Sequence, residues 1–440
     1  MTINEIYESV KEYIWQLERN KEKYLINPEK DFTRHRKISF SDCVMSLLCM
    51  SGGTLFSEVL EYFSDKTDLP SVSAYLQQRA KIKYSAFEQL FRSTVNLSDE
   101  NHLYHGYRLF AADGSDIQIP SNPMDEDTYY PGSNGQKPYN LIHLNAIYDI
   151  ITNTYQDVPI QGSRHCAEHE ALNHMVDCSC VNKALIIADR GYESYNVMAH
   201  IKEKGWKYLI RVKDIGGNGI VSRLDLPSSD EFDIDIDLNI TRKNSKKMMQ
   251  LFEDRNHYRY APPNSKLDFL PSRSSYKEDA VFYRLPFRVV RFKITENQYE
   301  TIVTNLDKYE FAPAELKRLY AMRWGIETSF RTLKYNIGVI YFHSWKKELV
   351  MQEVFARLAL FNITASIAGE PLKHISKKNY SYKVNVAKVI LICRKLFLDR
   401  ISPHYAQRLI STSVVPIRNE RSFKRKTKPR IAINFIYRIA

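Results

Sequence analysis

Three acidic residues occur where their carboxylates could bind hard cations. Asp113 follows the apolar run RLFAA, Asp189 follows ALIIA, and Glu327 lies within the segment LYAMRWGIETSFRTLK. Carboxylates and water are the ligands that Mg²⁺ and Mn²⁺ prefer. Two such ions about 3.5–4 Å apart can activate a water or hydroxyl group and stabilise the leaving oxygen of a phosphodiester. We therefore predict that Asp113, Asp189 and Glu327 are catalytic residues that bind Mg²⁺ or Mn²⁺, with two ions in the site.

Asp116 competes with Asp113 for the first of these positions. The stretch YRLFAADGSDIQIP predicts a strand, a tight turn at Gly114 and a second strand that ends at Pro120. We prefer Asp113 because it ends the apolar strand and directly precedes the glycine turn.

The segment that carries Glu327 has the pattern of an amphipathic helix. Pro313 and Glu315 suit its first turn, and Gly338 suits its end. One apolar stripe is formed by Leu319, Met322, Ile326, Phe330 and Leu333. A second stripe, within an arc of about 60°, is formed by Tyr320, Arg323, Glu327 and Lys334. At 1.5 Å per residue this polar row extends roughly 20 Å, long enough to follow several phosphates of a nucleic acid. The alternative is a solvated charged face.

The elements around these residues predict a mixed α/β sheet. A third strand, LIHLNAIYDI, is followed by a helix over Glu168–Asn182, the strand ALIIAD, another helix and the strand WKYLIRV. That order predicts antiparallel strands first and parallel strands after the crossovers. Residues 213–302 are expected to form a β-rich insertion, so the core would comprise residues 101–212 and 303–375. Asp113 and Asp189 would then lie at C-terminal strand ends, where open α/β sheets place their chemistry.

Residues 1–100 are expected to be helical. Two short helices followed by SVSAYLQQRAKIKYSAFEQLF resemble a helix-turn-helix, in which the later helix contacts DNA. In that helix Gln77 and Arg79 have side chains suited to base edges and phosphates, so we predict that both bind DNA. The alternative is the face of an ordinary helical bundle. Residues 376–440 are expected to be helical and basic, with the run RSFKRKTKPR as either a phosphate-binding arm or a disordered tail.

Composition and charge point to a polyanionic partner. The 440 residues carry a net charge of +12, with a pI near 9.1, and nucleic acid is the leading candidate. No apolar run is long enough to span a bilayer and the N-terminus does not resemble a signal peptide, so we expect a cytoplasmic protein without a membrane partner.

The cysteine and histidine residues show no repeated metal-binding unit. Six residues lie close together in sequence: His165, Cys166, His169, His174, Cys178 and Cys180. Zinc sites usually pair C-x2-C or H-x3-H units, which this cluster does not repeat, so an amphipathic helix with buried thiols is the preferred interpretation.

The motifs together resemble the DDE transposases of bacterial insertion sequences. Tyr320, Arg323, Glu327 and Lys334 match the Y-x2-R-x3-E-x6-K signature of the insertion-sequence-four group. ADGSDIQIP is similar to the family's first-aspartate segment, and IIADRGY is similar to its second. The three motifs occur in the family's order, with the β-rich insertion between the second aspartate and the glutamate.

This resemblance implies an RNase H-like catalytic core that cuts transposon ends and joins the 3′-hydroxyls to target DNA. It implies that Tyr320, Arg323 and Lys334 contact phosphates of the terminal repeats, that two protomers act together on DNA, and that the bacterial protein associates with the nucleoid when bound. Two other functions stay open: a metal-dependent nuclease without strand transfer, and an inactive DNA-binding regulator. Trp206 precedes the insertion, and whether a DNA hairpin forms also stays open.

Overall fold

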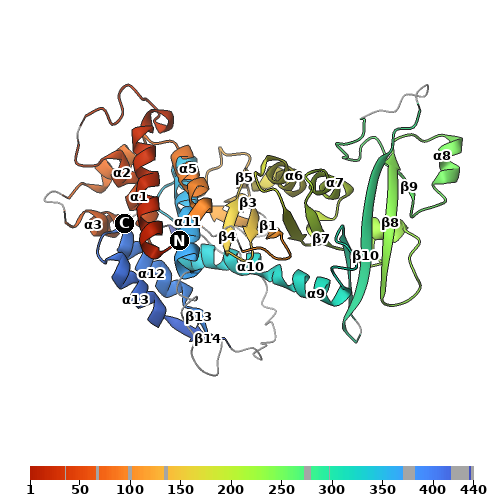
Figure 1. Ribbon diagram of the computed structural model, residues 1–440. Coiled ribbons are helices and arrows are strands. Elements are labelled where there is room, and N and C mark those ends of the chain that lie inside the picture. Colours follow the sequence, from red (N-terminus) through yellow and green to blue (C-terminus); the bar gives the residue numbers. More distant parts are fainter. Residues whose placement is uncertain are drawn as a thin grey trace.

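A central sheet joins a helical body to a β-rich end of the molecule (Figure 1). The computed structural model describes residues 1–34, 36–65, 69–97, 102–132, 137–271, 279–296, 298–369, 382–417 and 436–437. In this part of the chain no helix is long and apolar enough to cross a membrane.

Four strands form the centre of the sheet. They are β1 (Arg108–Ile119), β3 (Tyr139–Asp149), β6 (Ala184–Ala188) and β7 (Lys207–Val212). β1 is antiparallel to β3 and parallel to β6, and β6 is parallel to β7. The expected change from antiparallel to parallel pairing is therefore confirmed, and the topology is consistent with an RNase H-like core. Three short strands also pair with β3: β2 (Tyr129–Tyr130), β4 (Thr154–Asp157) and β5 (Ile160–Gly162).

The expected turn at Gly114 is wrong, because β1 is one continuous strand. Its antiparallel pairing with β3 passes through Gly114 opposite Asn145 and continues to Ile119. Its parallel pairing with β6 ends at Ala112 opposite Ala188. A Cβ atom at Gly114 would lie 2.3 Å from Nε2 of His143, so glycine is needed here for close packing rather than for a turn.

The region expected to be an insertion is β-rich but extends the core sheet. It contains β8 (Phe232–Thr241), β9 (Tyr258–Tyr260), β10 (Tyr283–Thr295) and β11 (Gln298–Thr304), with the short helix α8 (Lys246–Leu251). β11 pairs with β7, so the strand order is β2-β3-β1-β6-β7-β11-β10-β8-β9. The expected boundary at residue 302 falls inside β11.

Helices cover both faces of the central sheet (Figure 1). On one face lie α6 (Glu168–Cys178) and α7 (Tyr195–Glu203), whose apolar residues pack with Phe110 and Ala112 of β1. On the other face lie α9 (Pro313–Met322), α10 (Trp324–Arg331) and the π-helix η6 (Thr332–Ile337). Alternate residues of a strand point to opposite faces, which is why Ala111 instead packs with Ile326 and Phe330.

The helical body combines segments from both ends of the chain. The long helix α11 (Lys347–Gly369) is buried along most of its length and packs against helices that precede and follow it in sequence. The other helices of this body are α1 (Ile3–Arg19), α2 (Phe40–Cys49), α3 (Leu55–Phe63), α4 (Val72–Arg79), α5 (Ser85–Thr94), α12 (Val386–Phe397) and α13 (Pro403–Thr412). The N-terminal region is helical as expected, and the basic run at 421–430 lies outside the described residues.

The helix expected over residues 71–91 is interrupted. α4 ends at Arg79 and α5 begins at Ser85, and the residues between them pair with an extended segment after the first helix. Ile82 forms a β-bridge with Leu25, and the Lys83 amide donates to the Tyr24 carbonyl at 2.7 Å. These backbone bonds replace the helical ones, so the helix-turn-helix prediction loses its long third helix.

Short elements complete the described chain: η1 (Lys21–Tyr24), η2 (Val95–Leu97), η3 (Ser163–His165), η4 (Arg190–Tyr192), η5 (Ile220–Arg223), β12 (Tyr341–Phe342), β13 (Tyr382–Val384), β14 (Val414–Pro416) and β15 (Ile436–Tyr437).

Candidate active site

Two aspartates lie side by side where the parallel pairing of β1 and β6 ends. Because the parallel pairing ends at Ala112 and Ala188, the next residue on each strand is an aspartate: Asp113 on β1 and Asp189 after β6. Each side chain is oriented by a backbone amide. Gly114 donates to Oδ1 of Asp113 at 2.9 Å, and Gly191 donates to Oδ1 of Asp189 at 2.8 Å.

Glu327 reaches the same place from the helix that covers this face. The expected apolar stripe is confirmed as the docking surface, with Leu319, Ile326, Phe330 and Leu333 all buried. α10 packs on β1 through this stripe. The Glu327 carboxylate is oriented by a neighbour one helical turn earlier, because Nη2 of Arg323 donates to Oε1 of Glu327 at 2.6 Å.

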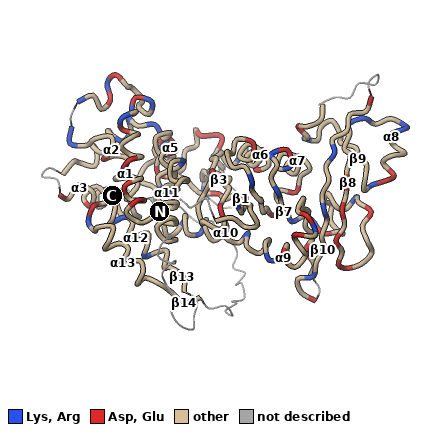
Figure 2. The backbone as a smooth tube through the Cα atoms, in the orientation of Figure 1, with Lys and Arg blue, Asp and Glu red and all other residues tan. Residues whose placement is uncertain are grey.

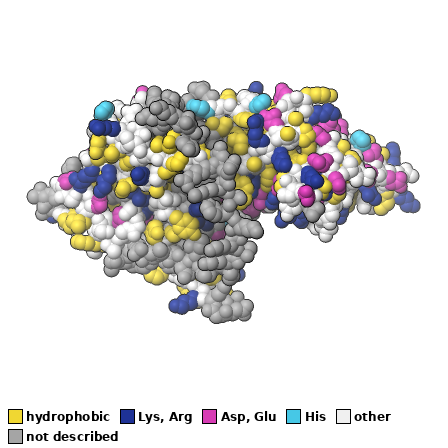
Figure 3. All heavy atoms as spheres, turned by 90° about the horizontal axis from the view of Figure 1, so that it is seen from below, with side chains coloured by type: hydrophobic (Ala, Val, Ile, Leu, Met, Phe, Trp, Pro, Cys, Tyr) yellow, Lys and Arg dark blue, Asp and Glu magenta, His cyan; other side chains and the backbone are white. Residues whose placement is uncertain are grey.

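The three acidic residues line one cleft of about 1100 Å³. Tyr320, Arg323 and Lys334 line it too, so the structure brings together the six cleft residues that the sequence singled out. Further basic and aromatic groups on its walls are Arg190, Arg211, Lys317, Trp324, Arg331 and Tyr335. Figure 2 shows basic residues on α9 beside charges of both signs on β10. Seen from below, acidic and basic side chains are intermixed over the β-rich end of the molecule (Figure 3).

The carboxylates influence one another electrostatically. The pKa of Asp113 is raised to about 6, mainly by burial and also by the charges of Asp189 and Glu327, while the Gly114 amide and Arg323 oppose the shift. Nη1 of Arg323 lies 3.8 Å from Oδ2 of Asp113. Such mutual repulsion is relieved when a divalent cation binds between the groups. An all-oxygen set of three carboxylates is also the donor set preferred by Mg²⁺ and Mn²⁺, so the residues fit such ions.

The cationic and phenolic groups beside Glu327 are partly unsatisfied. The Tyr320 hydroxyl and Nε of Arg323 are buried, with no hydrogen-bond partner in the described chain. The Arg323 guanidinium lies over the Tyr320 ring, 5.7 Å from its centroid. Buried polar atoms without partners cost free energy, so this corner of the cleft is suited to a ligand that supplies acceptor oxygens.

Lys334 lies at the far end of the row, on a last helical turn that differs from the expected one. The expected single helix is divided at Arg323 into α9 and α10 and becomes a π-helix over Thr332–Ile337, and it ends at Gly338 in the left-handed conformation (φ +89°), as expected. Nζ of Lys334 donates to the Asp116 carbonyl at 2.7 Å. Burial lowers the pKa of this ammonium group. A phosphate in the cleft would restore the charge stabilisation that burial removes.

The structure corrects the prediction for Arg79. Its side chain is buried, and its guanidinium donates to Gln352 and Leu349 and pairs with Glu353 at 2.9 Å. It therefore holds α4 against α11 inside the protein and does not present a charge to DNA. Gln77 is exposed on α4, so its contact with DNA stays a prediction.

Asp116 belongs to a different group on the opposite side of β1. Its carboxylate lies 2.8 Å from Nδ1 of His143 and accepts a hydrogen bond from Ser163 at 3.1 Å. The His143 contact lowers the pKa of Asp116. Burial lowers the pKa of His143, but Asp116 and Glu168 outweigh it and raise that pKa to about 9. The choice of Asp113 over Asp116 for the cleft thus agrees with their positions, although the glycine turn that supported it is not formed.

The cysteine and histidine cluster of the sequence is dispersed. Nε2 of His169 lies 2.6 Å from the Gly191 carbonyl, and His174 lies 3.6 Å from the Cys178 thiol. The expectation of buried thiols is wrong, because Cys178 and Cys180 are exposed. Only Cys166 joins a group of potential metal ligands in the described chain, and its neighbours there are His143 and Glu168.

Sequence reasoning missed Arg211 as a cleft residue. It lies on β7, pairs with Glu300 at 3.1 Å and approaches the Tyr320 ring at 5.8 Å. The available signal was an arginine that follows the apolar residues YLI within the strand WKYLIRV, because a charge on a core strand needs a partner.

Comparison with known proteins identifies the family. Residues 104–363, more than half of the chain, match the model of the transposase DDE domain, so the chain belongs to this family. DDE transposase domains are divalent-metal-dependent nucleases and transesterases that act in DNA transposition. No curated protein matches the chain. A matching solved structure is a piggyBac transposase synaptic complex with hairpin DNA, with 8% identity, a TM-score of 0.46 and coverage of 97% of this chain and 87% of that chain. This similarity is too low to transfer the role of any residue.

Proposed function

We propose that this chain cuts DNA at the ends of an insertion sequence of the insertion-sequence-four group and joins the freed 3′-hydroxyls to target DNA. The convergence of Asp113, Asp189 and Glu327 in one cleft, beside cationic groups, is the observation that carries the proposal. Water first attacks a phosphodiester and releases a 3′-hydroxyl, and that hydroxyl then attacks a phosphodiester of the target. Both steps exchange one P–O bond for another, so no oxidant or energy source is required.

The three carboxylates have the role of holding the metal ions. Two Mg²⁺ or Mn²⁺ ions, when bound, would activate the attacking oxygen and stabilise the leaving one. Gly114 and Gly191 keep Asp113 and Asp189 in fixed orientations through their amides. Arg323 does the same for Glu327 from the preceding helical turn.

Tyr320, Arg323 and Lys334 have the role of binding phosphates of the transposon end. The unsatisfied Tyr320 hydroxyl and Arg323 Nε can donate to phosphate oxygens, and Lys334 supplies a positive charge about three helical turns away from Arg323. One chain presents one such cleft, and joining both ends of a transposon calls for two clefts. A homodimer on DNA therefore forms part of the proposal.

The test is incubation of the protein with Mg²⁺ and a DNA fragment carrying the inverted repeats that flank its gene, together with a target plasmid. The proposal predicts cut ends and end–target joined products. Cleavage without joining would instead identify a nuclease. Binding of the repeats without chemistry would identify an inactive regulator and would overturn both enzymatic functions.

A further inference from the structure

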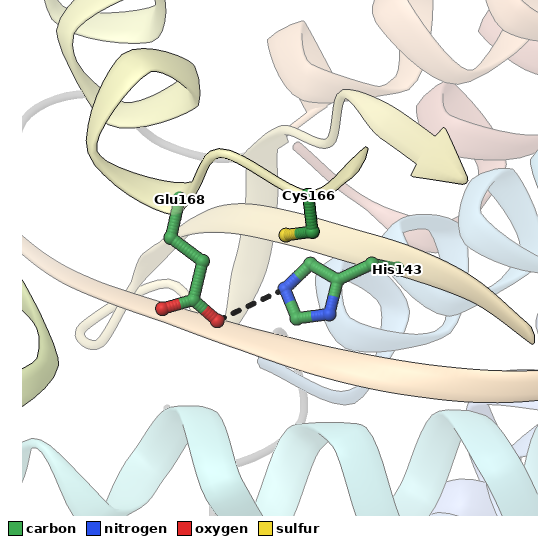
Figure 4. A group of neighbouring side chains, drawn as sticks. All are labelled: His143, Cys166 and Glu168. Atoms are coloured by element: carbon green, nitrogen blue, oxygen red, sulfur yellow. Dashed lines mark ion pairs between the residues drawn. The ribbon is translucent and has the colours of Figure 1, made fainter. Parts of the chain in front are cut away.

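A second group of potential metal ligands lies outside the cleft that holds Asp113, Asp189 and Glu327, the acidic triad. His143 comes from β3, Cys166 follows η3, and Glu168 is the first residue of α6. One ligand atom from each lies within 4.8 Å of the other two. In Figure 4 the Cys166 thiol and the Glu168 carboxylate both lie beside the same edge of the His143 ring. Two segments far apart in sequence, β3 and the short stretch between η3 and α6, thus bring a nitrogen, a sulfur and an oxygen donor together.

The imidazole of His143 is held in the orientation of a metal ligand. Nδ1 lies 2.8 Å from Oδ1 of Asp116, and that carboxylate is itself held by the Ser163 hydroxyl. A metal-binding histidine almost always donates its second ring N–H to a carboxylate or carbonyl in this way, which fixes the tautomer and leaves the other nitrogen for the ion. Asp116 therefore has the place of the carboxylate that supports such a ligand.

The other ring nitrogen is buried and lacks a hydrogen bond. His143 is only 7% exposed, and Nε2 has no hydrogen-bond partner in the described chain. It lies 3.2 Å from Oε1 of Glu168, an ion-pair distance without hydrogen-bond geometry. Two ligand atoms about 2.0–2.1 Å from one tetrahedral zinc ion are separated by about 3.3 Å, close to this spacing.

We propose that His143, Cys166 and Glu168 bind a zinc-class divalent ion through Nε2, Sγ and a carboxylate oxygen, with a water molecule as fourth ligand. A thiolate and an imidazole favour Zn²⁺ over Mg²⁺, so this ion would differ in kind from those of the acidic triad. It would join β3 to the start of α6 and, through Asp116, to β1. Oε2 of Glu168 lies close to Gly191, 3.7 Å from the position that an added Cβ would take. The ion would therefore brace the loop after β6 that carries Asp189.

Cobalt absorption of the full chain without DNA tests this site directly. After removal of metals by chelation, one equivalent of Co²⁺ should give a thiolate-to-cobalt charge-transfer band, which Zn²⁺ should abolish and excess Mg²⁺ should not. Cys166→Ser should eliminate the band. The matched control is the double variant Cys178→Ser/Cys180→Ser, which removes the exposed thiols and should keep the band. Co²⁺ at the carboxylates of the acidic triad has no sulfur ligand and gives no such band.

Asp116→Asn provides a second test that keeps all three ligands. Loss of the supporting carboxylate should weaken Co²⁺ binding by about 10–100-fold while the charge-transfer band is retained at saturation. Absence of the band in the wild-type chain, or its persistence in Cys166→Ser, would show that His143 is only a protonated bridge between Asp116 and Glu168 and would overturn the proposal. An unchanged Co²⁺ affinity in Asp116→Asn would overturn it as well. None of these measurements depends on DNA cleavage, so they are independent of the proposed transposition activity.

Discussion

At the scale of single residues, burial and the charges of neighbouring carboxylates distinguish Asp113 from other aspartates of the chain. Asp113 is only 23% exposed at its side chain, and two other carboxylates raise its pKa. Asp116, three residues further along the same strand, is 49% exposed and paired with a histidine. In the sequence both aspartates are candidates for the first metal ligand. The structure distinguishes them, because Asp113 faces the cleft and Asp116 faces His143 on the other side of β1.

The pH dependence of metal binding follows from Asp113. A metal ligand must be deprotonated, and the pKa of Asp113 is raised to about 6. The apparent affinity for Mn²⁺ should therefore fall as the pH is lowered through about 6, by up to about tenfold per pH unit, and should be nearly constant above about pH 7. Calorimetric titration of Mn²⁺ at several pH values measures this. In Asp113→Asn the remaining affinity should lose most of this dependence, and a wild-type affinity unchanged down to about pH 5 would contradict the assignment.

Lys334→Ala tests the phosphate-binding role at the end of the polar row. Removal of one phosphate contact should weaken binding of terminal-repeat DNA and of unrelated DNA by the same factor. It should also reduce the slope of the logarithm of the binding constant against the logarithm of the salt concentration by about 1. Gel-shift titrations over a range of salt concentrations provide the measurement. The matched control is Lys388→Ala, an exposed lysine on α12 outside the cleft, for which the slope should not change. Equal slopes in Lys334→Ala and the wild type would remove Lys334 from the DNA contacts.

At the scale of elements, the helix that carries Glu327 was the most predictable part of the site. Its apolar stripe, the start of the preceding α9 at Pro313 and the end of η6 at Gly338 all follow from the 3.6-residue period and from helix-end preferences, whereas the break between α9 and α10 does not. The π-helical last turn could not be predicted, because it depends on packing against neighbouring elements rather than on local preference. β1 shows the converse case. A glycine after an aspartate normally indicates a turn, but here it makes room for His143 on the neighbouring strand.

Gly338→Ala tests the helix end. The φ of +89° is unfavourable for a side chain, and a Cβ would lie 2.7 Å from the Tyr341 ring. We expect a loss of about 1–3 kcal/mol in the free energy of unfolding, measured by urea denaturation. The control is Gly216→Ala, where no heavy atom lies within 4 Å of the added Cβ and stability should change little. A Gly338→Ala protein as stable as the wild type would contradict the left-handed helix end.

At the scale of the whole molecule, the sequence predicted the class of fold but not how its parts combine. Alternating strands and helices predicted the mixed sheet, and the β-rich composition of 213–302 was recognised. The sequence did not reveal that β11 pairs with β7, because hydrogen bonds between distant strands leave no local pattern. It also did not reveal that α11 is enclosed by N- and C-terminal helices. The sequence therefore predicts DNA contacts for Gln77 and Arg79 of α4, although Arg79 is inside this body.

Arg79→Met tests the internal role of that arginine. Removal of its charge leaves Glu353 buried with a weaker set of partners, and breaking a buried ion pair costs about 3–5 kcal/mol. Urea unfolding should show this loss, whereas DNA affinity of the folded variant should stay close to that of the wild type. Lys81→Met, a lysine just after α4, is the matched control and should have nearly wild-type stability. A stable Arg79→Met protein with weakened DNA binding would restore Arg79 as a DNA contact.

Asp113 within β1, Asp189 directly after β6 and Glu327 on α10 are proposed to form one metal-dependent site for cutting DNA. The most direct measurement compares wild type, Glu327→Gln and Glu310→Gln for Mg²⁺-dependent cleavage and for binding of the same terminal-repeat DNA. Glu327→Gln should lose at least about 100-fold in cleavage while binding is largely retained, because it removes a metal ligand but keeps the shape of the cleft. Glu310→Gln, an exposed glutamate before α9, should cleave normally. Normal cleavage by Glu327→Gln would contradict the account.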